Sequence, residues 1–145
     1  MSKLASFFRD SDTEFGVFSP QYHLLAIFPG MADATAAKAE LHLAGYVEQD
    51  VVAASGEEVV RFAKEHLQKD GLWGMLMTEL SRAFGTEAAY ADRDLAAAKR
   101  GQAFLAVYCP SSESKSGAWK ILEPRHPLVA RYYSAGGIEH LAGEG

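Results

Sequence analysis

Two unbroken apolar runs stand out along the chain, and each ends at residues that form turns. The first run, YHLLAIF at 22–28, is followed by Pro29 and Gly30, and the second, QAFLAVYC at 102–109, is followed by Pro110. Short apolar runs closed by turn residues are typical of buried strands. We therefore expect two core strands here, lying side by side at the centre of one sheet.

Three weaker runs predict further elements. VEQDVVAAS at 47–55 and LVARYYS at 128–134 mix apolar with polar residues, which favours strands at the edges of the sheet. IEHL at 138–141 follows a pair of glycines and predicts a short terminal element.

Apolar residues at helical spacing predict the helices. Between 33 and 44 they recur every three or four residues, with Asp33 as the expected N-cap and Gly45 as a left-handed C-cap. Ser55 and Glu58 match the Ser-x-x-Glu capping box, which predicts a helix that begins at Gly56. The same criteria predict three further helices, at 72–84, at 87–100 with Thr86 as its N-cap, and at 118–122.

Without the middle helices, the order of elements is strand, helix, strand, strand, helix, strand. This is the split βαβ order of a ferredoxin-like α+β sandwich, in which two helices cover one face of the sheet. The helical segment at about 70–100 is then an insertion between the second and third strands. The chain has no internal repeat and no low-complexity tract, so we expect residues 1–145 to form a single domain.

Charge and composition exclude several classes of protein. A formal net charge of -5 with scattered basic residues argues against a nucleic-acid partner. The apolar segment KDGLWGMLMTELSRAFG at 69–85 is interrupted by charged residues, so we expect no membrane span there. Because Cys109 is the only cysteine, an intramolecular disulfide is impossible, and we expect a cytoplasmic protein.

Two segments resemble the halves of bacterial general-stress-protein-like domains. The first, at 23–55, contains the Leu-x-x-Ala-Gly helix end at 41–45, and the second, at 90–123, contains a Tyr...Arg-Gly helix end before an apolar strand. Trp73, Met75 and Met77 stand where that family usually carries a glycine zipper, so a membrane role is not carried over. The resemblance implies the fold and a bacterial stress-related setting, and it implies no catalytic residues.

Residues that could carry catalysis form no clear constellation. The five histidines show no metal-ligand spacing, so we expect no metal and no cofactor. Cys109 ends an apolar strand without a local base, which favours an inert thiol. Asp92 and Asp94 lie two residues apart and so on different sides of a helix, where we expect solvated charges.

Candidates for ligand binding are easier to name. His23, Tyr108 and Tyr132 bring polar groups into apolar strands, and small-molecule sites combine a few polar groups with an apolar wall. Trp73 and Met77 belong to an apolar stripe that packs in the core or at an interface, or else forms the wall of a ligand site. The five candidates are therefore His23, Trp73, Met77, Tyr108 and Tyr132.

Two functional hypotheses follow. The first is a non-enzymatic bacterial stress-related or regulatory module, which forms a homodimer and binds a small apolar or aromatic ligand. Both faces of the core strands are apolar, so either a second copy or the inserted helices must cover the face that two sandwich helices leave open. The alternative is a small enzyme of the dimeric α/β-barrel type, with His23, Tyr108 or Tyr132 near a substrate on the open sheet face.

Overall fold

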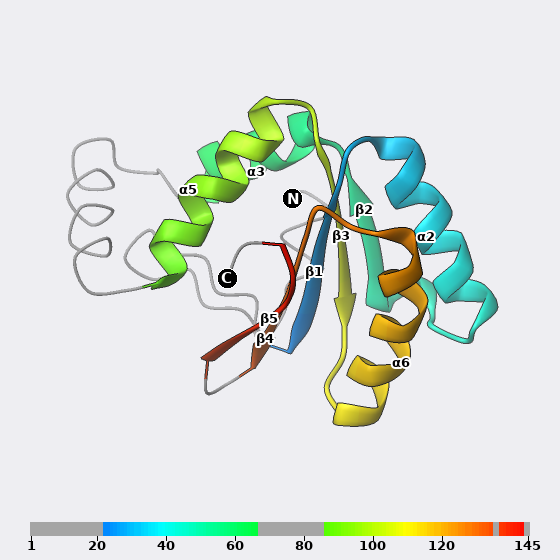
Figure 1. Cartoon of the computed structure of the whole chain (residues 1–145). Helices are drawn as coiled ribbons and strands as arrows, with labels where there is room; N and C mark the ends of the chain where they lie inside the picture. The colour runs from blue at the N-terminus through cyan, green and yellow to red at the C-terminus, as the bar shows by residue number, and fades with distance from the viewer. Residues whose placement is uncertain (1–21, 67–85, 135–136, 144–145) are drawn as a thin grey trace.

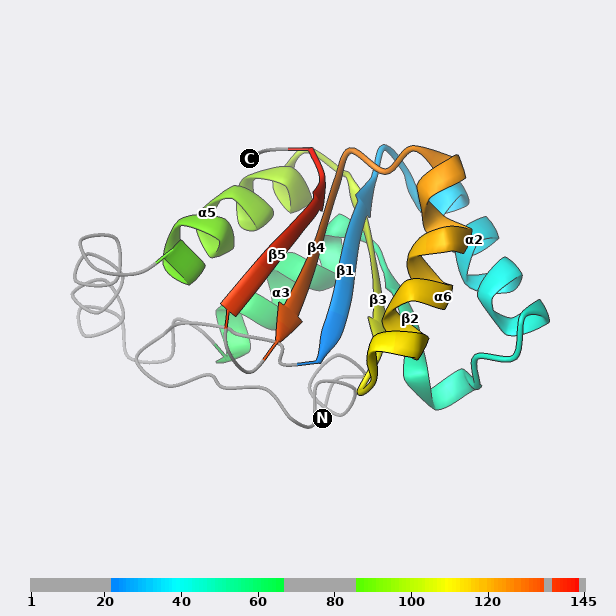
Figure 2. The ribbon, with the colours of Figure 1, turned by 60° about the horizontal axis from the view of Figure 1, so that its bottom comes forward.

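The computed structural model describes residues 22–66, 86–134 and 137–143. Within them, five strands form one antiparallel sheet in the order β2-β3-β1-β4-β5 (Figure 2). The strands are β1 (His23–Phe28), β2 (Val51–Ala54), β3 (Ala103–Tyr108), β4 (Val129–Ser134) and β5 (Gly137–Ala142).

The two most apolar strands lie next to each other, as predicted. β1 pairs with β3 from His23 opposite Tyr108 to Phe28 opposite Ala103. β2 is an edge strand, which also confirms the prediction. β4 is not at an edge, because the terminal segment forms β5 and pairs with it. The prediction that 128–134 forms an edge strand is therefore wrong, and β5 is the edge strand on that side of the sheet.

Four helices are described, together with two short 3-10 turns. In Figure 1, one pair of helices lies on each side of the sheet, so the described chain has three layers. The helices are α2 (Met31–Leu43), α3 (Gly56–His66), α5 (Thr86–Lys99) and α6 (Ser112–Leu122), and the turns are η2 (Glu48–Asp50) and η3 (Glu123–Arg125).

Strand alternation divides the core into two clusters. The α2/α6 face of the sheet carries Leu24, Leu105 and Val107, which pack with Leu41 of α2 and Leu122 of α6. The opposite, α3/α5 face carries Leu25, Ile27 and Phe104, which pack with Phe62 of α3 and with Ala97 and Ala98 of α5. Both faces are apolar, as predicted, and a helix pair of the same chain packs on each of them.

The helix predicted to begin at Gly56 is confirmed as α3. Both α3 and α5 lie in the chain between β2 and β3. The helix predicted at 72–84, with Trp73 and Met77, lies outside the described residues. The chain is thus a mixed α and β protein with an antiparallel sheet.

Three of the helix-end features predicted from the sequence are present in the structure. Ser55 Oγ accepts from the Glu58 amide at 3.2 Å, and the Ser55 amide donates to Glu58 Oε1 at 3.0 Å, which is the predicted capping box. Gly45 and Gly101 adopt φ values of +108° and +87°, in the left-handed region. The N-cap of α2 is Gly30 instead of Asp33, which lies in the first turn and stabilises the positive end of the helix dipole.

Candidate functional site

The α3/α5 face of the sheet carries a cluster of polar side chains among apolar ones, which we call the face cluster: His23, Asp94, Tyr108, Arg131 and Tyr133. His23 is completely buried and lies between Tyr108 on β3 and Tyr133 on β4 in the strand register. The rings of His23 and Tyr108 are 5.1 Å apart between centroids and tilted by 50°. Alternation along β4 puts Arg131 on the same face as Tyr133.

Arg131 is the centre of the face cluster, because its charge is fully buried, with 0% of its surface exposed. One guanidinium nitrogen donates to the hydroxyl of Tyr133 at 2.7 Å, and the other donates to Oδ1 of Asp94. The guanidinium carbon also lies 5.7 Å from the centroid of the Tyr133 ring. A buried cation needs a carboxylate partner and further hydrogen bonds to offset its lost hydration. Arg131 therefore binds α5 to β4 through a charged pair.

The structure brings together only part of the predicted ligand set. His23 and Tyr108 are neighbours on the α3/α5 face. Tyr132 belongs to the core cluster on the other face, where its hydroxyl donates to the carbonyl of Cys109 at 2.7 Å. Trp73 and Met77 lie outside the described residues, so their packing in the core or at an interface, or their place in the wall of a ligand site, stays a prediction.

Three members of the face cluster, Asp94, Arg131 and Tyr133, were missing from the predicted set. Arg131 stands in the apolar run LVARYYS, at an alternate position from Tyr133, and a charge at such a position indicates a buried ion pair. Asp94 was expected to be a solvated charge, and this was wrong, because its carboxylate pairs with Arg131 and its side chain is only 16% exposed.

Cys109 lies apart from the face cluster. It belongs to the core on the α2/α6 face and is completely buried. Burial, and secondarily the charge of Asp50, raises the pKa of its thiol to about 12. Since the thiolate is the reactive form, the neutral Cys109 thiol is a poor nucleophile at neutral pH.

The part of the chain that the structure describes contains neither a metal-binding group nor a membrane-spanning helix. Among residues 22–66, 86–134 and 137–143, no group of three or more His, Cys, Asp or Glu side chains is arranged to hold a metal ion. No helix in the same ranges combines the length and the apolar character needed to cross a membrane.

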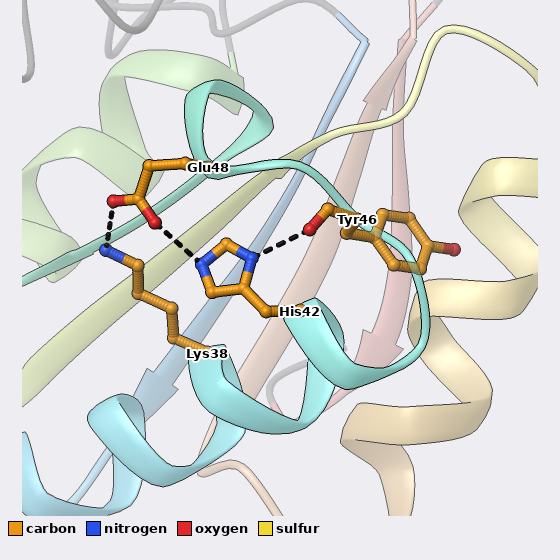
Figure 3. Close-up of polar contacts among 4 residues, drawn as sticks. All are labelled: Lys38, His42, Tyr46 and Glu48. Carbon is orange, nitrogen blue, oxygen red and sulfur yellow. Dashed lines mark hydrogen bonds and ion pairs between the residues drawn. The ribbon is translucent and has the colours of Figure 1, made fainter.

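A second polar cluster holds the turn after α2 in place (Figure 3). Glu48 in η2 accepts from Lys38 Nζ at 3.2 Å, and its other carboxylate oxygen lies 3.0 Å from His42 Nε2. His42 Nδ1 is 2.7 Å from the carbonyl oxygen of Tyr46, so this nitrogen must carry the proton and donate it. Tyr46 in turn donates its hydroxyl to the Ser114 carbonyl at 2.7 Å, which connects the turn to α6.

Acid should weaken this turn. The hydrogen bond from Lys38, and then the Lys38 charge, hold the pKa of Glu48 below the usual value of 4.5. Because the folded-state pKa is the lower one, Glu48 contributes stability above the unfolded pKa and loses it as the pH falls through the folded pKa. We expect wild type to lose more stability than Glu48→Gln when urea unfolding is compared at about pH 6 and about pH 3.

The control for this experiment is Glu123→Gln, at an exposed position in η3. It should keep the full acid sensitivity of the wild type. Equal pH dependence of wild type and Glu48→Gln would contradict the prediction.

Comparison of the chain with protein-family models, with curated proteins and with solved structures found no match.

Proposed function

We propose that this chain is a non-enzymatic, cytoplasmic module of ferredoxin-like fold, which binds a small apolar or aromatic ligand at the face cluster and acts as a dimer in a bacterial stress-related or regulatory setting. The order β4-β1-β3-β2, antiparallel throughout, supports the fold. Helix α2 connects β1 to β2, and α6 connects β3 to β4, as the split βαβ order requires. β5 is then an addition at one edge.

The observation that carries the ligand proposal is the composition of the α3/α5 face. The face cluster supplies an imidazole, two phenols and a guanidinium–carboxylate pair, and the strands around it supply Leu25, Ile27 and Phe104. Sites for small molecules combine apolar walls with a few polar groups that fix orientation. Apolar or aromatic ligands with one hydrogen-bonding group fit this chemistry.

Binding is favoured over catalysis because the polar groups already make contacts within the protein or are unreactive. Arg131 has its charge matched by Asp94 and donates to Tyr133, so both guanidinium ends already serve contacts within the protein. The thiol of Cys109 lies on the other face and is neutral. The small-enzyme alternative depends on the neighbouring rings of His23 and Tyr108, since an imidazole and a phenol can exchange protons with a substrate.

The setting and the dimer depend on other observations. The resemblance of 23–55 and 90–123 to bacterial general-stress-protein-like domains supports the stress-related setting. A single, completely buried cysteine suits a reducing cytoplasm. For the dimer, a second copy would cover the apolar side chains of the α3/α5 face beside β4 and β5, where Ile138 and Val129 are only partly buried.

Native mass spectrometry of the purified full chain tests the ligand and the dimer together. We expect a dimer of the 15.7 kDa chain that retains a small molecule, which is recovered chemically unchanged. A bare monomer under gentle ionisation would overturn both parts. If the bound molecule is converted during incubation, the enzyme alternative replaces the binding module.

A pair of tyrosine variants locates the ligand. Tyr108→Ala removes a ring from the face cluster and should abolish retention of the small molecule. Tyr132→Phe removes a hydroxyl on the opposite face and should leave retention unchanged. Equal loss in both variants would show that the ligand responds to general stability, and the face cluster would then not be its site.

A further inference from the structure

An open groove lies between α3 and the end of α5. Its volume is about 480 Å³. From α3 it is lined by Glu57, Val60, Arg61 and Lys64, which recur at helical spacing and therefore share one face of that helix. The end of α5 supplies Ala98, Lys99 and Gly101.

The charge of the groove is opposite to that of the whole protein. Arg61, Lys64 and Lys99 supply three positive charges against the single carboxylate of Glu57, which leaves a surplus of +2 in a chain of net charge -5. Glu57 pairs with Arg61 at 3.3 Å, so the surplus is centred on the two lysines. A concave surface lined by one sign of charge raises the local concentration of small ions of opposite sign.

The floor of the groove is apolar, while its rim is cationic. Val60 is half-buried, and Ala98 is only 3% exposed. Gly101 ends α5 in the left-handed region, and an added Cβ there would meet no atom within 4 Å, so the α5 end of the groove is open. Lysine side chains of this kind cover apolar surface with their stems and present their charge at the edge.

We propose that this groove binds a phosphate monoester with a small apolar substituent. A phosphate monoester carries nearly two negative charges at neutral pH, because its second pKa is about 6, and this matches the surplus charge of the groove. The substituent lies on Val60 and Ala98, and the phosphate lies between Lys64 and Lys99. This site is separate from the face cluster and does not depend on the proposed function.

The test is a titration of the full chain with phenyl phosphate, followed by NMR. We expect saturable shifts at the amides of Val60, Ala98 and Gly101. Phenol, which lacks the charge, should give none, and inorganic phosphate, which lacks the ring, should bind more weakly. Equal affinity for phosphate and phenyl phosphate would overturn the assignment of a monoester, and shifts that never saturate would overturn the site.

Charge variants provide the second readout. Lys64→Gln and Lys99→Gln should each weaken binding about threefold or more, as expected for exposed ion pairs. Lys120→Gln makes the same change of net charge at an exposed position on α6, which packs on the other face of the sheet, and should leave the affinity unchanged. If all three variants weaken binding equally, the effect is one of overall charge and the groove is not the site.

Discussion

Asp94→Asn should lower the free energy of unfolding by about 3–5 kcal/mol, the range measured when one partner of a buried ion pair is removed. The substitution keeps the size of the side chain and removes its charge. Arg131 then keeps its own positive charge at 0% exposure without the carboxylate that offsets it. The contact with Tyr133 supplies a neutral acceptor only, which replaces part of the lost hydration.

Removing the other partner should cost less. Arg131→Met takes away the buried cation, and the carboxylate of Asp94 is 16% exposed, so that it can regain contact with water. We expect a loss of about 2 kcal/mol, mostly from the hydroxyl of Tyr133 that loses its donor. Combining Arg131→Met with Asp94→Asn should add little to that loss, because the buried cation that made Asp94 necessary is gone.

Urea unfolding of the wild type, the two single variants and the double variant gives the coupling between the two sites. The expected order of stability places Asp94→Asn lowest. An Asp94→Asn protein within about 1 kcal/mol of the wild type would show that the pair is not the main compensation for the Arg131 charge. Equal losses in the two single variants would contradict the asymmetry that follows from their different burial.

The core strands of this fold could be predicted because their local sequence pattern is sufficient to identify them. The apolar runs that became β1 and β3 are closed by Pro and Gly on the chain itself, and their central, adjacent position follows from burial on both faces. β5 was harder, because only one edge of it is paired and its residues are partly exposed. β5 is stabilised as a strand by its pairing with β4. The local sequence of β5 contains no pattern that indicates this pairing.

The face cluster likewise contains residues that could be predicted from the sequence and one whose role could not. His23 and Tyr108 were named as ligand candidates because each brings a polar group into an apolar strand, and the register of β1 and β3 places them opposite each other. By strand alternation Arg131 was predictable as a buried charge on the face of Tyr133. Its partner was not, because the pairing with Asp94 depends on where α5 crosses the sheet, which is set by packing and not by the sequence of α5.

The second large expected loss of stability concerns the close contact between α3 and the end of α5. Gly56→Ala should destabilise the protein by about 3 kcal/mol, at the upper end of what added atoms cost in a tightly packed interior. A Cβ at Gly56 would lie 2.1 Å from the carbonyl oxygen of Ala98 and 3.0 Å from that of Gln102. Both are backbone atoms, so no side-chain rotation can relieve the overlap.

Neither helix end can move away without losing hydrogen bonds. The carbonyl of Ala98 accepts from the amide of Gly101 at 3.0 Å, in the turn that ends α5. On the other side, the capping box between Ser55 and Glu58 fixes the first turn of α3. Relief of the overlap must therefore separate the two helices, which would also widen the groove that they line.

Gly30→Ala is the matched control, because it also adds one methyl group at a helix start. Gly30 is the N-cap of α2 at φ −153°, in extended backbone, and a Cβ there would meet nothing within 4 Å. Its loss should stay at about 0.5 kcal/mol, the difference between glycine and alanine at an N-cap. Comparison of the two variants by urea unfolding separates the overlap at Gly56 from the general effect of the added methyl group. Equal stability of the two variants would show that α3 and α5 do not pack as closely as this contact requires. If Gly56→Ala unfolds at a much lower urea concentration than the wild type while Gly30→Ala does not, the close packing at Gly56 is confirmed.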